Sequence, residues 1–166
     1  VYSAVAAHEV MVASGRGAAP SFVGRLRDLE APPAPEPGVC PSVAAIAALL
    51  EVGRVLTFSE DMVEARRVEL EAELRQRGLS EELIRRSADY GVLVARHVLK
   101  WAGGDNYQES RSWARYDPRD GGETWLPTGP DYMEAVEPNW SKIRTLSIES
   151  PFFFNETATT EIYTEP

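Results

Sequence analysis

The sequence predicts an all-α fold, in which a helical bundle is followed by a long irregular C-terminal arm. Apolar residues recur at spacings of three and four in four segments, residues 1–13, 42–57, 59–77 and 80–102. Serine, which is favoured at helix N-caps, begins the last three segments, and acidic residues follow it in the last two. Glycines come directly after the last two segments and are expected to end them.

The first predicted helix covers residues 1–13. It lacks an initiator methionine and begins inside an apolar pattern, so we expect further residues to precede it in the natural protein. The absence of a signal peptide therefore carries no information about compartment. One face of it comprises Val1, Val5, His8 and Val12, with Ala4 and Met11 beside them.

Residues 15–41 are rich in glycine and proline and enclose a short apolar and basic turn at residues 22–29. Proline fixes φ and has no amide donor, so this segment is expected to be a loop that lies on another surface. The chain's single cysteine, Cys40, falls in it. One cysteine excludes an internal disulfide, and without cationic neighbours the thiol is expected to be inert.

The second predicted helix, residues 42–57, has Ser42 as its N-cap and is apolar around most of its circumference. We therefore expect it to be buried on most sides. The stripe consists of Val43, Ile46, Ala47, Leu50 and Arg54, widened by Leu49, Val52 and Leu56.

The third predicted helix, residues 59–77, begins at Ser59 with Glu60 and Asp61 in its first turn and ends before Gly78. Glutamate and arginine alternate along it, so it is expected to pack on the outside with one face in water. Its few apolar residues are Met62, Val63, Val68, Leu70 and Leu74.

The fourth predicted helix, residues 80–102, shows the clearest pattern: a Ser80 cap, Glu81 and Glu82 in the first turn, and a stop at residues 103–104. We expect it to form the core, and its small residues would let a neighbouring helix approach closely. The buried row is Leu83, Ser87, Gly91, Val94, Val98 and Ala102, flanked by Ile84, Ala88 and Ala95.

Residues 105–166 show no helical period and are too long for an ordinary loop. In residues 125–146, Trp125 and Trp140 flank turns that prolines stiffen, which predicts an aromatic-anchored strap. We expect this arm to pack on a body that is partly missing. Three consecutive phenylalanines at residues 152–154 are expected to be buried there, because exposed they would promote aggregation.

Composition excludes several classes of function. The 166 residues carry a net charge of −9 at pH 7, and 43% of them are hydrophobic, as in a soluble globular protein. Nucleic acid and anionic membrane surfaces attract a concentrated basic face, so neither is an expected partner. No run reaches the roughly 18 to 20 apolar residues of a membrane span.

The sequence predicts no catalytic residue and no metal ligand in this chain. His97 lies beside the buried row of its helix, where a hydrogen-bonded packing role is expected. His8 and Glu9 begin a metalloprotease-like pattern, but Val12 stands where its second histidine belongs. A calcium loop at residues 103–107 fails because the alternating oxygen ligands stop too early.

Lys142 and Arg144 are the candidates for a substrate or anion site. The simpler explanation is an ordinary cluster of ion pairs with the nearby Glu137 and Glu149.

Three sequence features resemble those of a known protein family. They are a helix that ends in WA, a DNY turn, and the later stretch W.PTGPDY..A.EPNW.KIR.L. The chain resembles the N-terminal half of bacterial proteins in the superfamily of vanadium-dependent haloperoxidases and type 2 phosphatidic acid phosphatases (PAP2). The matching residues are Trp101, Ala102, Asp105, Tyr107, Trp125, Pro127, Thr128, Pro130, Tyr132, Glu137, Pro138, Asn139, Trp140, Lys142, Ile143 and Arg144.

This resemblance implies a helical fold whose catalytic residues lie further along: a Lys with an Arg-Pro, a Ser-Gly-His, and an Arg followed by His. The chain contains neither Ser-Gly-His nor Arg-Pro, and Lys142 and Arg144 are too close together to be the first of these motifs. It would therefore be the non-catalytic helical part of a phosphatase or haloperoxidase. Vanadate or phosphate would bind in the parent protein, and the partner would be its C-terminal catalytic half.

Several alternatives stay open. The resemblance does not distinguish a phosphatase from a haloperoxidase. It leaves open whether the protein forms a homodimer. It implies a periplasmic or secreted location. In a different class, the chain would be a stand-alone helical interaction module without catalysis.

Overall fold

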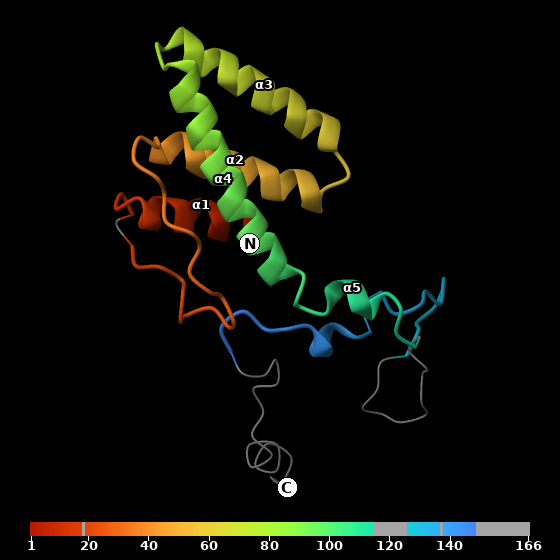
Figure 1. The fold of residues 1–166 in the computed structure, drawn as a ribbon. Coiled ribbons are helices and arrows are strands. Elements are labelled where there is room, and N and C mark those ends of the chain that lie inside the picture. Colours follow the sequence, from red (N-terminus) through yellow and green to blue (C-terminus); the bar gives the residue numbers. More distant parts are fainter. Residues whose placement is uncertain (18, 115–125, 137, 149–166) are drawn as a thin grey trace, which may run out of the picture. The chain divides into compact units, whose positions relative to one another are not determined.

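The computed structural model describes residues 1–17, 19–114, 126–136 and 138–148. Two compact units divide the chain, Val1–Gly104 and Asp105–Pro166. The first unit contains the helices α1 (Tyr2–Ala13), α2 (Pro41–Leu56), α3 (Glu60–Gln76) and α4 (Glu81–Ala102) (Figure 1).

The second unit contains the short helix α5 (Tyr107–Ser110) and the 3₁₀ turn η1 (Trp140–Lys142). In the described part of the chain, the only β feature is an isolated bridge between Val23 and Leu26, so the all-α class is confirmed. No helix in the described ranges combines the length and the apolar character that crossing a membrane requires.

The four long helices coincide with the predicted segments to within one residue at each end, and their caps explain the small differences. Ser80 caps α4 as predicted, since its hydroxyl accepts a hydrogen bond from the Leu83 amide at 3.3 Å. Ser42 is not a cap. Helix α2 begins one residue earlier with Pro41, whose fixed φ suits the first helical position and whose missing amide needs no partner there.

The core lies where α4 packs on α2 and where both contact α1 (Figure 1). Gly91 sits at the closest approach of α4 to α2. A Cβ atom on Gly91 would lie 2.3 Å from the carbonyl oxygen of Ala44 and 2.8 Å from the Cβ of Ala47. The prediction that small residues on α4 admit a neighbouring helix is confirmed. Fully buried side chains in this core include Val10, Val52, Ile84, Ser87, Val94 and Val98.

The apolar face expected of α1 is buried only in part. Val5 is buried as expected, but Val1 and Ala4 are exposed. Because α1 is apolar nearly all round, its pattern does not select a face, and contacts with α2 and α4 decide which side is buried. The buried residues of α1 are Val5, Ala6, Glu9 and Val10.

Burial of α2 on most sides is also wrong. The helix buries one side, including Val43, Ala48 and Val52, against α1 and α4. Ile46 and Leu49, which were predicted to be buried, remain 41% and 44% exposed.

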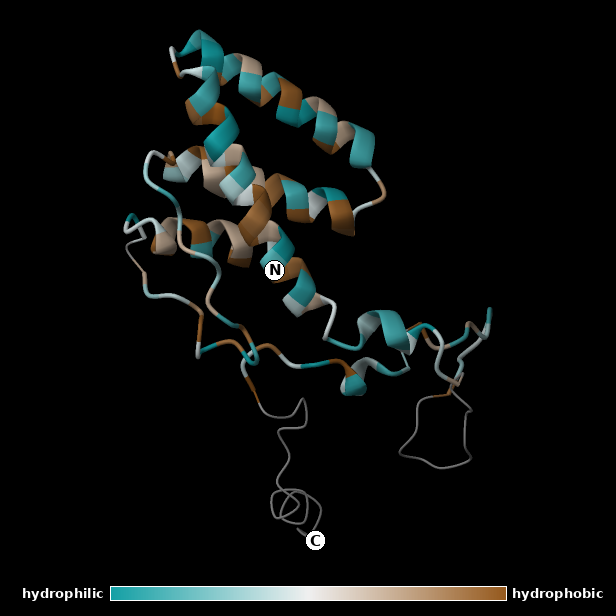
Figure 2. Ribbon diagram, viewed as in Figure 1, coloured by the Kyte–Doolittle hydropathy of each residue, from teal (hydrophilic) through white to brown (hydrophobic). Residues whose placement is uncertain are grey.

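Helix α3 packs on the outside, as predicted: none of its residues is buried, and it contacts only α2 and α4 among the described helices. Figure 2 shows its largely hydrophilic surface beside the more hydrophobic α2. Gly78, which follows it, has φ of +86°, the left-handed conformation expected of a glycine that ends a helix.

The arm is irregular in its described parts, apart from α5, which the sequence did not predict. Trp140 is 63% exposed, so its indole is not an anchor among the described residues. Trp125 and Phe152–Phe154, which were expected to be buried, lie outside the described residues.

Candidate functional site

The proline-rich segment between α1 and α2, called the connection here and comprising residues 14–40, lies along α4. Three side chains of α4 donate hydrogen bonds to its carbonyl oxygens: the indole Nε1 of Trp101 to Arg27 at 2.8 Å, Nε2 of His97 to Glu30 at 3.0 Å, and the hydroxyl of Tyr90 to Pro33 at 2.9 Å.

These contacts match two periodicities. The carbonyls belong to residues three apart in the sequence. The donors are four and seven residues apart and so share one side of α4. The prediction that this segment needs a surface to lie on is confirmed, and the surface is α4 of the same chain.

The end of the connection is held in the same way. Arg86 donates to the carbonyl oxygen of Pro37 at 3.2 Å. The Ser87 hydroxyl accepts a 2.9 Å hydrogen bond from the Cys40 amide and donates to the carbonyl oxygen of Leu83 at 2.6 Å. The backbone amide of Cys40 is therefore held in place at the start of α2.

Glu9 holds the start of the connection. Its carboxylate is only 2% exposed and accepts two hydrogen bonds of 2.7 Å, from the Ser21 hydroxyl and from the Phe22 amide. The Ser21 hydroxyl in turn accepts from the Val23 amide at 3.0 Å. A buried carboxylate needs such donors, so Glu9 organises the turn at residues 21–26.

Sequence reasoning considered Glu9 only within a failed metal motif. An acid on an otherwise apolar helix was the signal that could have identified it, because a buried carboxylate requires partners elsewhere in the chain.

The two histidines are structural. Nε2 of His8 lies 3.0 Å from the carbonyl oxygen of Pro20, and Nε2 of His97 makes the equivalent contact with Glu30. A carbonyl oxygen only accepts, so both Nε2 atoms carry a proton and offer no lone pair to a ligand. The predicted hydrogen-bonded packing role of His97 is confirmed.

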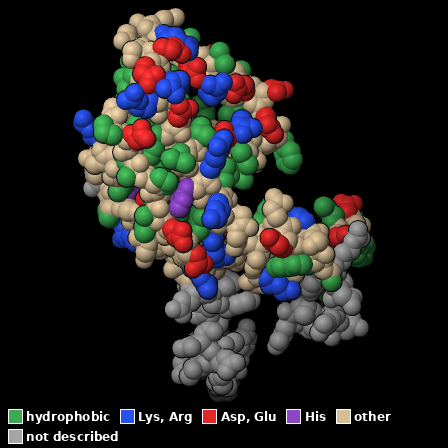
Figure 3. All heavy atoms as spheres, in the orientation of Figure 1, with side chains coloured by type: hydrophobic (Ala, Val, Ile, Leu, Met, Phe, Trp, Pro, Cys, Tyr) green, Lys and Arg blue, Asp and Glu red, His purple; other side chains and the backbone are tan. Residues whose placement is uncertain are grey.

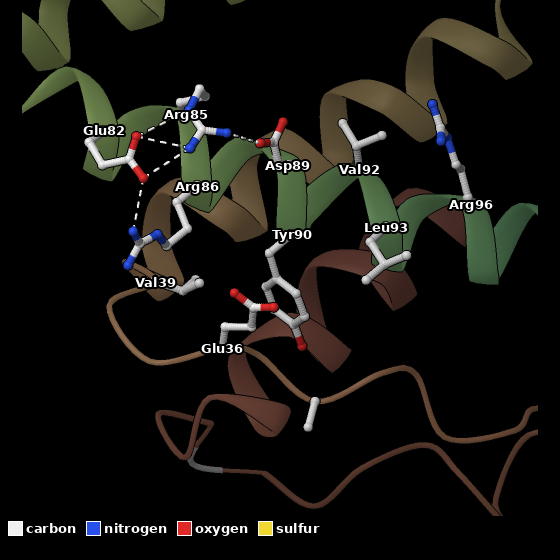
Figure 4. A pocket seen from close by; sticks show the side chains of 11 residues that line it. Glu36, Val39, Glu82, Arg85, Arg86, Asp89, Tyr90, Val92, Leu93 and Arg96 are labelled. Atoms are coloured by element: carbon white, nitrogen blue, oxygen red, sulfur yellow. Dashed lines mark hydrogen bonds and ion pairs between the residues drawn. The ribbon is translucent and has the colours of Figure 1, made fainter.

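A groove of about 630 Å³ lies between α4 and the connection. In Figure 4, Arg85 and Arg86 both reach Glu82, and Arg85 also reaches Asp89; these three ion pairs measure 2.8 to 2.9 Å. Hydrogen bonds from Arg85 and then Arg86 lower the pKa of Glu82, and burial raises the pKa of Tyr90.

Four charged side chains of this groove, Glu82, Arg85, Arg86 and Asp89, pair with one another. Each of the ion-paired side chains is at least 42% exposed, and such exposed pairs contribute little to stability or to binding. Figure 3 shows the same mixture of acidic and basic side chains over this part of the surface. The groove lacks the single-signed field that would select a charged substrate.

The second unit brings together two motifs that are distant in the sequence. The amide of Arg144 donates to the carbonyl oxygen of Asp105 at 2.9 Å, and the Asn106 side chain donates to the carbonyl oxygen of Lys142 at 3.1 Å. The Lys142 ammonium lies 5.4 Å from the ring centre of Trp113, within cation–π distance. Residues 105–113 and 142–144 therefore form one cluster, called the motif junction.

Lys142 is exposed at this junction, and Arg144 is half-buried. Their expected ion-pair partners, Glu137 and Glu149, lie outside the described residues. The junction contains three cationic side chains, Arg111, Lys142 and Arg144, but no histidine. Both histidines of the chain have Nε2 hydrogen-bonded to carbonyl oxygens in the first unit. The side chains of the motif junction therefore do not fit an oxyanion such as vanadate that is held through a histidine.

Within the described part of the chain, no three His, Cys, Asp or Glu side chains gather as a metal ion would require.

Three comparisons with known proteins bear on this chain. No protein-family model matches the chain, and no curated protein matches it. Among solved structures, the chain is similar to a bacterial vanadium-dependent iodoperoxidase, with 34% sequence identity and a TM-score of 0.78. The alignment covers 90% of this chain and 36% of the iodoperoxidase chain, so this chain spans about a third of that protein's length.

Proposed function

We propose that this chain, which has a vanadium haloperoxidase-like fold, is the non-catalytic helical part of a larger enzyme of that kind. It supports a catalytic bundle contributed by other residues of the same polypeptide. Vanadate or phosphate binds in that other part, and this chain supplies a rigid body beside it.

The observation that carries the proposal is the asymmetry of the comparison. A match at 34% identity extends over 90% of this chain but only 36% of the iodoperoxidase. The agreement is therefore with a portion of an enzyme. The motif junction supports the same conclusion, because the two sequence motifs that carry the family resemblance contact each other in the second unit.

For the enzyme as a whole, halide oxidation is the favoured activity, since the similar structure is that of an iodoperoxidase. Phosphate-ester hydrolysis is the alternative, because the same resemblance includes the PAP2 phosphatases.

A stand-alone interaction module is the competing function. The observation in its favour is that Val1–Gly104 has its own core, in which Val10, Val52, Val94 and Val98 have no exposed surface. Such a core would let the unit fold without a catalytic half.

The mass of the native protein tests the proposal. An antibody raised against residues 1–104 should detect, in the source cells and their secreted fraction, a species well above the 18.4 kDa of this chain. The purified native protein should then bind vanadate and oxidise iodide or bromide with hydrogen peroxide, and p-nitrophenyl phosphate is assayed in parallel. A native species of 18.4 kDa that binds no vanadate would refute the proposal in favour of the module.

A further inference from the structure

Helix α2 carries an apolar stripe on the side that points away from the core. Ile46, Leu49, Gly53 and Leu56 follow one another at spacings of three, four and three, so they lie on one face of the helix. The three large side chains are 41%, 44% and 52% exposed. We call these four residues the α2 stripe.

Met62 and Val68 of α3 are exposed as well, but each stands beside charged residues of that helix. The only charged residues of α2, Glu51 and Arg54, pair with each other at 2.9 Å, and Arg54 also reaches Glu60 of α3. Helix α3 carries arginine–glutamate ion pairs along its length, and Figure 2 shows that most of its residues are hydrophilic. Single exposed apolar residues are ordinary, but several in register along one uncharged helix face are typical of a contact surface.

Gly53 points to close packing on this stripe. A glycine inside a helix is destabilising relative to alanine, so it needs a reason. At Gly91 the reason is Ala44, which a Cβ would meet at 2.3 Å. A Cβ on Gly53 would meet nothing within 4 Å, so the described residues of this chain do not require a glycine there. A helix that crosses the stripe at Gly53 would require one.

We propose that the α2 stripe seats an apolar helix from the remaining part of the same polypeptide, with a large aliphatic or aromatic side chain over Gly53. This inference rests on the proposed function and adds to it the contact surface and the chemistry of the segment that fills it.

Surface area favours a covalently continuous segment over a separate protein. Three half-exposed aliphatic side chains offer on the order of 300 Å², whereas a stable complex buries about 800 Å² on each partner. A segment of the same chain has an effective concentration in the millimolar range, so a smaller surface is sufficient. The iodoperoxidase comparison leaves room for such a segment, because this chain matches only 36% of that protein.

A single substitution, Gly53→Ala, distinguishes an empty stripe from a filled one. In the 166-residue chain the added methyl group meets nothing, so it should raise the midpoint of thermal unfolding by about 2–4 °C. In the full-length protein encoded by the gene, the same methyl group would separate two packed helices. The midpoint of thermal unfolding should then stay the same or decrease. An equal rise in both proteins would overturn the inference.

Thiol labelling gives a second measurement that does not depend on stability. In a Cys40→Ser background, Leu49→Cys reports on the stripe, and Val68→Cys, at a position that is 53% exposed on α3, is its matched control. In the full-length protein a maleimide should modify position 49 at least about tenfold more slowly than position 68. In the 166-residue chain the two rates should be similar.

Hydroxyl-radical footprinting of the unmodified proteins makes the same comparison without any substitution. A stripe that is oxidised equally in the full-length protein and in the 166-residue chain would overturn the inference, although a native mass well above 18.4 kDa would leave the proposed function intact. A native protein of 18.4 kDa would refute both. The stripe could also be protected from oxidation already in the 166-residue chain, which would overturn the proposed occupant. Protection that increases with protein concentration would identify a second copy of the chain as the occupant. Protection that is independent of concentration would identify a segment of these 166 residues.

Discussion

The indole Nε1 of Trp101, near the end of α4, donates a 2.8 Å hydrogen bond to the carbonyl oxygen of Arg27, which is 74 residues earlier in the chain. Trp101 is 7% exposed, and its ring meets the ring of Tyr2 edge to face at 5.3 Å. One side chain thus joins α4 to α1 and to the connection, two segments that lie far earlier in the chain.

Trp101→Phe keeps an aromatic ring but removes this donor, so the carbonyl oxygen of Arg27 loses its hydrogen bond from the indole. We expect a loss of about 1–2 kcal/mol in the free energy of unfolding. Urea denaturation followed by far-UV circular dichroism measures it. Trp140→Phe, at a side chain that is 63% exposed, is the control and should change stability by less than about 0.5 kcal/mol. Equal effects of the two substitutions would argue against the role of the hydrogen bond.

Gly91→Ala should destabilise the chain by about 1–3 kcal/mol, because its Cβ would lie 2.3 Å from the Ala44 carbonyl oxygen and α4 would have to move away from α2. The midpoint of urea unfolding reports this loss. Gly53→Ala in the same 166-residue chain is the matched control, since it adds the same atom to the neighbouring helix in open space. If Gly91→Ala were neutral, the close approach of α4 to α2 would be wrong.

Glu9→Ala should cost about 1–3 kcal/mol, because the Ser21 hydroxyl and the Phe22 amide would lose a buried acceptor. Glu9→Gln retains one acceptor oxygen and should lose less. Hydrogen exchange should be faster at the amides of residues 21–26 in Glu9→Ala, and this local signal separates loss of the turn from a general loss of stability. Glu36→Ala, at an exposed position of the connection, should leave both measurements unchanged.

The Glu51–Arg54 pair should make a small pH-dependent contribution to stability. The hydrogen bond from Arg54 holds the pKa of Glu51 below its ordinary value of 4.5, so the unfolded chain binds this proton more readily than the folded chain. The stabilisation is therefore present above pH 4.5 and is lost as the pH falls through the lower folded-state value.

Glu51→Gln is the corresponding test. It should lower the free energy of unfolding by about 0.5–1 kcal/mol at pH 6, and the difference from the unmodified chain should shrink below pH 4. A difference that stays constant across this range would show that Glu51 contributes by packing and not by its charge.

The helices were predictable because their signals are local. Ser80, Gly78 and the first-turn acids of α3 and α4 act within a few residues of the chain, so the ends of these helices follow from neighbouring residues. The predicted Ser42 cap failed on the same local scale, because Pro41 was a better start for α2 than a serine one residue later.

The candidate site was less predictable. Lys142 and Arg144 were identified from the sequence, but their contacts with residues 105–113 join segments that are distant in the chain, and no local pattern encodes such contacts. The donors on α4 were missed for a similar reason. Tyr90 and Trp101 read as apolar residues of a core helix, and their polar atoms acquire a role only when the connection lies beside them.

By itself, the sequence determined the helical class, the bounds of the four long helices and the close packing at Gly91, since repeat, caps and side-chain size are properties of each segment alone. Only the tertiary structure decided which face of α1 and of α2 is buried. Both helices are apolar on more than one side, and each can bury only the side that meets a neighbour of matching shape. The exposed α2 stripe is the consequence of that choice.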